Sequence, residues 1–147
     1  MRPFVPLLLL AVVVGCQPAA PGTPDELAAR YHSGHDSGNL EALTRLVCWD
    51  RVDERTRRSV EKQLGQELGR PITETRVEVL SPGFELEYAL DGITYRPNLV
   101  PVRRLRITFT PAEPGEPPRT EAMSFLLGVK DGGYWIAPVA PVSTTSG

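Results

Sequence analysis

Two histidines and an aspartate, His32, His35 and Asp36, stand within five positions of each other. Imidazole nitrogens and a carboxylate are ligands that zinc prefers, so this cluster would offer three ligands to one metal ion. The surrounding letters, HSGHDSGN, are also typical of an exposed helix connection, in which histidine and aspartate serve as turn or cap residues. The sequence favours the solvated connection, and we assign no metal and no cofactor.

Three other side chains are candidates for binding a ligand: Arg103, Tyr88 and Trp135. By strand alternation Arg103 shares a face with Leu105 and Ile107. At the open end of a curved sheet its guanidinium would receive an anionic ligand or pair with a glutamate of a neighbouring strand. The alternative is that Arg103 reaches out to water along its own stem, and that the two aromatic residues belong to the core or to a sheet face.

Acid–base catalysis has few candidates in this chain. The nearest are Asp50 beside Trp49, and the tyrosines Tyr31, Tyr88 and Tyr95. A buried carboxylate would have the raised pKa that proton transfer needs. Each candidate also has a structural role available, as a helix cap, a core aromatic or a sheet-face residue. The sequence contains no serine nucleophile elbow, phosphate-binding glycine loop or paired CxxC cluster, and we assign no catalytic residue.

Residues 1–15 have the order of a secretory signal: a positive charge at Arg2, an apolar segment at 4–14 and small residues after it. The apolar segment is shorter than the roughly 20 residues that span a bilayer. At its end, Val-Val-Gly-Cys at 13–16 resembles the lipobox of bacterial lipoproteins. The resemblance implies cleavage before Cys16 and attachment of fatty acids such as palmitate to that cysteine. An ordinary secreted protein with a chance cysteine, or an uncleaved anchor, are the alternatives.

An acylated Cys16 would hold the protein on a lipid bilayer without crossing it, because two or more acyl chains bind stably. Gln17 stands where an aspartate often marks inner-membrane retention, so the resemblance implies an outer membrane facing the periplasm in a diderm cell. Residues 16–23 would be the lipidated cysteine and a proline-rich tether. Cys48 would then have no cysteine partner; we expect a buried small hydrophobe there, the alternative being a reactive thiol.

The composition fits one globular domain. The chain has 147 residues, of which 41% are hydrophobic and 23% charged, and its formal net charge is −2. We place the domain at residues 24–140 and a disordered tail at 141–147. The charge leaves no strong basic excess, so we expect no nucleic-acid partner.

Helices are expected in the first half of the domain. TPDE at residues 23–26 combines a threonine cap, a proline at the first helical position and a glutamate three residues after the cap. A second helix is predicted from about Leu40. Asp50 or Asp53 would cap a third, in which apolar residues recur every four positions from 60 to 68.

From residue 73 the apolar period changes to two, which predicts strands. Residues 84–90 and 102–110 each place apolar side chains on one side and charged side chains on the other. Asp-Gly at 91–92 and KDGG at 130–133 predict tight hairpins. The fold class is therefore α+β, with three N-terminal helices packed on a curved antiparallel sheet of four to six strands.

Tyr31, the helix restart GNLEAL at 38–43 and the ending KDGGYWI at 130–136 resemble the nuclear transport factor 2-like superfamily, a cystatin-like cone. The resemblance covers residues 24–140 and implies a pocket at the wide end of the cone, which some members use for catalysis and others for binding.

We therefore expect a membrane-anchored lipoprotein of the bacterial cell envelope. Its domain would be non-catalytic and would bind an unknown small ligand or an envelope protein. The alternatives are a small-molecule lyase or isomerase that uses a pocket carboxylate, and an envelope-assembly lipoprotein that acts through surface contacts.

Overall fold

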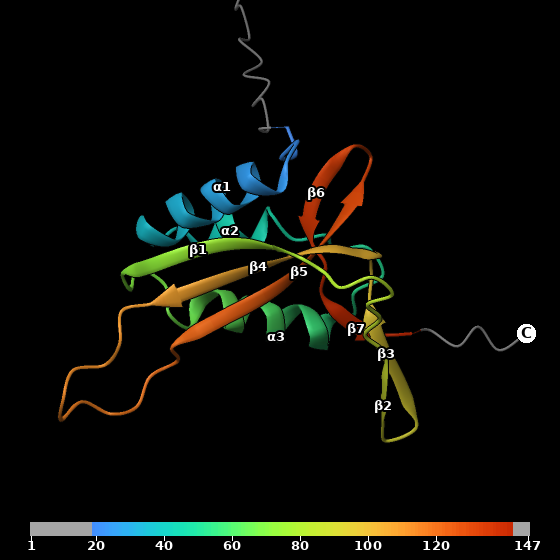
Figure 1. Ribbon diagram of the computed structural model, residues 1–147. Helices are drawn as coiled ribbons and strands as arrows, with labels where there is room; N and C mark the ends of the chain where they lie inside the picture. Colours follow the sequence, from blue (N-terminus) through green and yellow to red (C-terminus); the bar gives the residue numbers. More distant parts are fainter. Residues whose placement is uncertain (1–18, 143–147) are drawn as a thin grey trace, which may run out of the picture.

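The computed structural model describes residues 19–142. Within this range three helices precede seven strands, and all the named strand pairs are antiparallel. In chain order the elements are α1 (Pro24–Asp36), α2 (Leu40–Thr44), α3 (Glu54–Gly65), β1 (Ile72–Val79), β2 (Tyr88–Leu90), β3 (Ile93–Pro97), β4 (Pro101–Phe109), β5 (Ala122–Lys130), β6 (Gly133–Ile136) and β7 (Val139–Pro141). The α+β class with three helices is as the sequence predicts (Figure 1).

Each helix begins at a side chain that accepts a hydrogen bond from a free backbone amide. Thr23 accepts from Glu26 N–H at the start of α1, and Asn39 accepts from Ala42 N–H at the start of α2. Of the two aspartates predicted as caps for the third helix, Asp53 is the one that accepts, from Thr56 N–H. These bonds satisfy donors that the first turn of a helix leaves unpaired.

The main sheet has the strand order β1-β4-β5-β6. Its inner face is formed by alternate residues of the central strands, so that Leu105 lies opposite Phe125 and Ile107 opposite Met123. These side chains are buried together with side chains of all three helices, among them Leu27, Leu43 and Leu64. The helices thus cover the apolar face that the sequence pattern predicts.

The strands do not form one continuous sheet. β2, β3 and β7 make a separate sheet of three strands in the order β2-β3-β7, which we call the minor sheet. β2 is shorter than the predicted strand of residues 84–90, since it begins only at Tyr88. The register would place Leu86 opposite Pro97, a residue without a backbone N–H to donate, and β3 ends there.

The C-terminal boundary also differs from the sequence prediction of a tail starting at residue 141. Pro141 lies opposite Tyr95 in the minor sheet, and Val142 N–H donates to the carbonyl of Thr94 at 2.8 Å. Residues 141 and 142 therefore belong to the domain. The predicted tail from 143 to 147 lies outside the described residues, as do the predicted signal segment and Cys16.

The outer edge of β6 is covered by two segments from the N-terminal half of the chain. Tyr134 N–H donates to the carbonyl of Pro21 at 2.8 Å. Ile136 N–H donates to Leu46, and its carbonyl accepts from Cys48 N–H at 2.9 Å. These bonds satisfy an edge that would otherwise offer free backbone groups to another chain.

Candidate functional site

The minor sheet has an apolar face that is open to solvent. The cross-strand pairs Tyr88–Tyr95 and Leu90–Ile93 place their side chains on this face. The two tyrosine rings are stacked, with centroids 5.3 Å apart and planes 11° apart. Leu90 is 57% exposed and Ile93 45% exposed, so the face has apolar side chains that the rest of the domain does not bury.

This face forms one wall of an open hollow of about 560 Å³, which we call the groove. The opposite wall is α3, whose lining residues are Arg55, Thr56, Ser59, Gln63 and the apolar Val60. The floor is made by residues 124–126 of β5 and by Ala137 and Pro138. One wall is thus apolar and aromatic and the other mostly polar, a combination common at binding sites.

The floor of the groove includes a strand edge. The pairing of β6 with β5 ends at Leu127, which lies opposite Ile136. One further bond follows, from Ala137 N–H to the carbonyl of Leu126 at 2.8 Å, and the chain then continues into β7. No described strand pairs with residues 122–125 of β5 on that side. The backbone there borders the groove.

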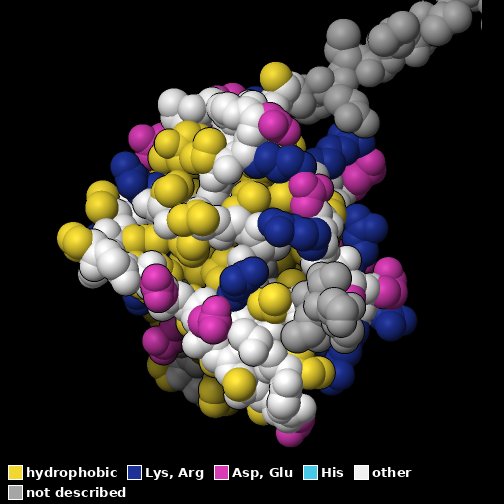
Figure 2. All heavy atoms as spheres, turned by 90° about the vertical axis from the view of Figure 1, so that its right-hand side faces the viewer, with side chains coloured by type: hydrophobic (Ala, Val, Ile, Leu, Met, Phe, Trp, Pro, Cys, Tyr) yellow, Lys and Arg dark blue, Asp and Glu magenta, His cyan; other side chains and the backbone are white. Residues whose placement is uncertain are grey.

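A second hollow, of about 700 Å³, lies on the opposite face of the minor sheet. It is lined by side chains of both charges, including Arg51, Arg96, Glu85 and Glu87. Figure 2 views the molecule from the side on which β2, β3 and β7 lie, and shows hydrophobic side chains gathered beside Lys and Arg side chains. The second hollow thus combines charged side chains with apolar ones such as Phe84 and Leu99, whereas the groove side of the minor sheet is apolar.

The structure separates the three predicted ligand-binding residues. Tyr88 lines the groove. Arg103 lies on the inner side of β4 opposite Leu127, as alternation predicts, but its guanidinium donates to the neighbouring carbonyl of Val102 at 2.8 Å and lines neither hollow. Trp135 lies on β6, half-buried, with its Nε1 donating to the carbonyl of Lys130 at 3.3 Å.

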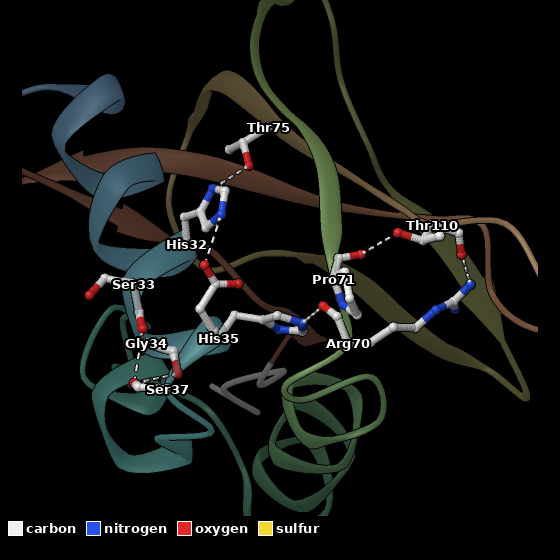
Figure 3. A network of polar contacts seen from close by, with 10 residues as sticks. His32, Ser33, Gly34, His35, Ser37, Arg70, Pro71, Thr75 and Thr110 are labelled. Atoms are coloured by element: carbon white, nitrogen blue, oxygen red, sulfur yellow. Dashed lines mark hydrogen bonds and ion pairs between the residues drawn. The ribbon is translucent and has the colours of Figure 1, made fainter.

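The alternative of a metal cluster is not assembled, because the two imidazoles point in different directions (Figure 3). The prediction of an exposed connection is wrong for His35, since α1 continues to Asp36 and buries this ring. His32 is on the surface, where its Nε2 lies 3.1 Å from the carboxylate of Asp36. His35 is completely buried, and its Nε2 donates to the carbonyl of Arg70 at 3.0 Å. Among residues 19–142 no three His, Cys, Asp or Glu side chains come close enough to hold a metal ion.

The inner face of the main sheet is filled by aromatic rings. Tyr31 and His35 are one turn apart on α1, and their rings stack with centroids 5.9 Å apart. Tyr31 contacts Phe125, and His35 contacts Phe109. The hydroxyl of Tyr31 and Nδ1 of His35 are buried without a hydrogen-bond partner. Burial raises the pKa of Tyr31 to about 12, because the phenolate would lose its hydration.

The remaining candidates have structural roles. Cys48 is free and buried, which confirms the expected small hydrophobe. The carboxylate of Asp50 pairs with Lys130, and this hydrogen bond raises the pKa of Lys130. Asn98, which sequence reasoning did not single out, donates from Nδ2 to the carbonyls of Cys48 and Asp50 at 2.8 and 3.0 Å and ties their loop to the minor sheet.

Sequence reasoning also missed the groove. The alternation of apolar residues from 84 to 95 predicts a face that the helices cover, and the structure leaves this face open to solvent. No pattern within residues 84–95 shows that these strands pair with β7 in a separate sheet and leave a hollow toward α3.

No protein-family model matches the chain, and no curated protein matches it. One solved structure that is similar to it is a nuclear transport factor 2 (NTF2-like) superfamily protein from Salmonella enterica subsp. enterica serovar Typhimurium str. LT2. The two are 13% identical, the match covers 83% of this chain and 92% of that chain, and the TM-score is 0.33. A similarity at this level does not place the chain in that superfamily. No described helix has the length and hydropathy needed to cross a bilayer.

Proposed function

We propose that the protein is a lipid-anchored lipoprotein of the bacterial cell envelope whose domain is a non-catalytic binding module. Cys16 carries the acyl chains, and the domain, a divergent cone of the nuclear transport factor 2-like kind, stands on the periplasmic face of the outer membrane where the cell is diderm. The groove is its binding surface, and the partner is an envelope protein that presents an apolar segment.

The observation that carries this proposal is the exposed apolar face of the minor sheet. Of the eight large hydrophobic side chains that are exposed in the described range, four lie between residues 86 and 93. All four, Leu86, Tyr88, Leu90 and Ile93, line the groove. Apolar side chains gathered on one surface are typical of a site that another molecule covers.

Two features of the groove favour a protein partner. It is open, and its floor includes the edge of β5 beyond the last bond from β6. An extended segment would pair with backbone groups of such an edge and place alternate side chains against the apolar wall. The inner face of the main sheet, where the cone pocket was expected, is occupied by Tyr31, Phe109 and Phe125.

A photo-crosslinking amino acid at Tyr88 tests the binding surface, in the full-length acylated protein on native membranes. We expect discrete protein adducts that disappear when Ile93→Asp is added. The matched control is the same photo-crosslinker at Arg106, an exposed residue on the outer side of β4. Equal adducts from the two positions would contradict the proposed surface, and adducts of small-molecule mass alone would indicate a low-molecular-weight ligand instead.

The anchor is tested separately by mass spectrometry of the N-terminal peptide from the purified membrane protein. We expect a chain that begins at Cys16 and carries the added mass of fatty acids. An unmodified Cys16, or a peptide that still continues into Gly15, would contradict the lipoprotein assignment.

A further inference from the structure

The residues that follow the anchor position are fixed to the domain. Tyr134 N–H donates to the carbonyl of Pro21, and the guanidinium of Arg30 donates to the carbonyl of Ala19 at 2.5 Å. Gly22 N–H donates to the carboxylate of Glu26 at 2.7 Å, and Pro21 is fully buried. Residues 19–22, which we call the docked segment, therefore lie along β6 as part of the fold, although the sequence predicted a free tether there.

The docked segment fits against β6 because residue 133 is a glycine. A Cβ atom at Gly133 would lie 2.5 Å from the Cβ of Ala20, closer than two carbon atoms can approach. The methyl of Ala20 thus takes the place that a side chain of residue 133 would need.

Charge holds the same segment from the side of α1. Glu26 pairs with Arg30 at 2.5 Å while it accepts from Gly22 N–H. The hydrogen bond from Gly22, and next the one from Arg30, lower the pKa of Glu26, so its carboxylate is ionised at neutral pH. The three residues form one connected contact between the docked segment and the first two turns of α1.

This contact shortens the free chain between lipid and domain. Only Gln17 and Pro18 separate Cys16 from Ala19. Three peptide steps span at most about 11 Å even when fully extended. The lipid attachment point is therefore held close to one particular end of the domain, the end made by Ala19, the start of α1 and the turn between β5 and β6.

The groove lies at the other end. In Figure 1 the start of α1 and the turn before β6 are at the top of the molecule, whereas β2 and β3 are at the bottom right and α3 lies below the main sheet. We propose that the end formed by residues 19–22, the first turn of α1 and the β5–β6 turn rests on the bilayer that carries the acyl chains of Cys16, and that the groove consequently faces away from this membrane. The inference rests on the proposed acylation of Cys16.

Trp135 belongs to the membrane-facing end. A Cβ atom at Gly133 would lie 3.4 Å from Trp135 Nε1, so this indole lies beside the docked segment. Tryptophan is enriched at the level of lipid headgroups, where its ring is partly apolar and its N–H is solvated or bonded. This gives Trp135 a role at the bilayer in place of the ligand contact predicted from sequence.

The test is a depth measurement on the full-length acylated protein. Fluorophores are attached to Asp25→Cys, at the start of α1, and to Ala89→Cys, on β2; both positions are exposed, and the native Cys48 is buried. The protein is reconstituted in phosphatidylethanolamine–phosphatidylglycerol vesicles that contain a headgroup nitroxide quencher. We expect quenching at position 25 to exceed quenching at position 89 several-fold. Equal quenching at the two positions would overturn the proposed orientation.

Gly133→Ala asks whether the docked segment sets the orientation. The added methyl displaces Ala20, which lengthens the free chain to about six residues and lets the domain rotate, so the quenching ratio should fall toward one. Gly65→Ala is the matched control, since its nearest neighbour would be an ordinary 3.8 Å away. The double variant Ala20→Gly with Gly133→Ala moves the methyl from one side of the contact to the other and should restore the ratio. A ratio that Gly133→Ala leaves unchanged would overturn the role of the docked segment.

Two further readouts separate this inference from the proposed anchor. Mass spectrometry and flotation with the vesicles report on acylation, whatever the orientation. Hydrogen exchange of the Tyr134 amide reports on the docked segment, and we expect strong protection of that amide, lost in Gly133→Ala. A chain that floats but shows equal quenching overturns the orientation alone, whereas a chain that is not acylated overturns the anchor.

Discussion

The two ends of this domain treat their exposed strands differently. At β6, the backbone edge is paired with other segments: Tyr134 bonds with Pro21, and Ile136 bonds with Leu46 and Cys48. At the minor sheet, the apolar face made by β2 and β3 is left open. A free backbone edge favours unwanted pairing with another chain, and an exposed apolar face is typical of an interaction site. At β6 other segments of the chain pair with the backbone. No described segment covers the apolar face of the minor sheet, as is typical of a binding surface.

The largest expected effect comes from comparing one substitution, isoleucine to alanine, at a core position and on the open face. Ile136 is 2% exposed and Ile93 is 45% exposed. Ile136→Ala should lower the free energy of unfolding by about 2 to 5 kcal/mol, because it removes buried methyl groups and leaves a cavity, whereas Ile93→Ala should cost well under that range. Urea unfolding of both variants measures the difference. A loss of similar size at Ile93 would mean that the groove face is part of the folding core.

Alkaline pH should weaken the covered core through Tyr31. Its folded pKa, about 12, lies above the ordinary value of 10, so its contribution to stability is complete below pH 10 and is lost as pH rises from 10 to 12. The loss is at most about 2 to 3 kcal/mol, at 1.4 kcal/mol per pKa unit. Tyr31→Phe should remove this part of the pH dependence while leaving stability at pH 7 nearly unchanged, because the hydroxyl has no partner to lose. Parallel unfolding curves at pH 9 and 11 for the two proteins check it.

Asn98 ties the loop at residues 48–50 to the minor sheet, and its removal should lower the free energy of unfolding. Asn98→Ala leaves the carbonyls of Cys48 and Asp50 without their donor, at a cost of about 1 to 3 kcal/mol. Asn98→Asp should not rescue stability, because a carboxylate cannot donate to two carbonyl oxygens. Thermal unfolding measures both variants. If the aspartate variant were as stable as the original chain, the two bonds would not be what holds this loop.

The smallest expected effect on stability is at the tip of the groove face. Leu90→Ala should change the free energy of unfolding by less than about 0.5 kcal/mol, since the side chain is 57% exposed. The same substitution should weaken the crosslink from position 88, because it removes part of the apolar wall. A clear loss of stability together with an unchanged crosslink would reverse the comparison between the two ends.

Local signals in the sequence predicted most of the elements. Thr23 and Asp53 cap the helices as expected, and the hairpin at 91–92 is formed with positive φ at both Asp91 and Gly92, as a tight two-residue turn requires. These features depend on neighbours a few residues apart. Chemistry that arises within one stretch of chain is what a single sequence shows most directly.

Features that join distant segments were not predictable in the same way. Alternation identifies the apolar side of residues 84–95, but it does not show that β3 pairs with β7 in a separate sheet, where the paired residues Tyr95 and Pro141 are 46 positions apart. In the sequence His32 and His35 form one cluster, but in the structure α1 places the ring of His35 in the core and leaves His32 on the surface. The sequence predicts a tether at residues 19–22. The contact that fixes this segment is not visible there, because the glycine against which Ala20 packs is far along the chain, at position 133.

Arg70 has a consequence for the longest loop of the domain. Its guanidinium donates to the carbonyls of Thr110 and Thr120, and so holds the two ends of the proline-rich loop together. Beyond that clamp the loop extends away from both ends of the domain (Figure 1). Lengthening a loop whose ends are already fixed adds little entropic cost. Residues 112–117 are therefore where a reporter peptide or a small fluorescent domain would be inserted with the least disturbance to the lipid attachment and to the groove.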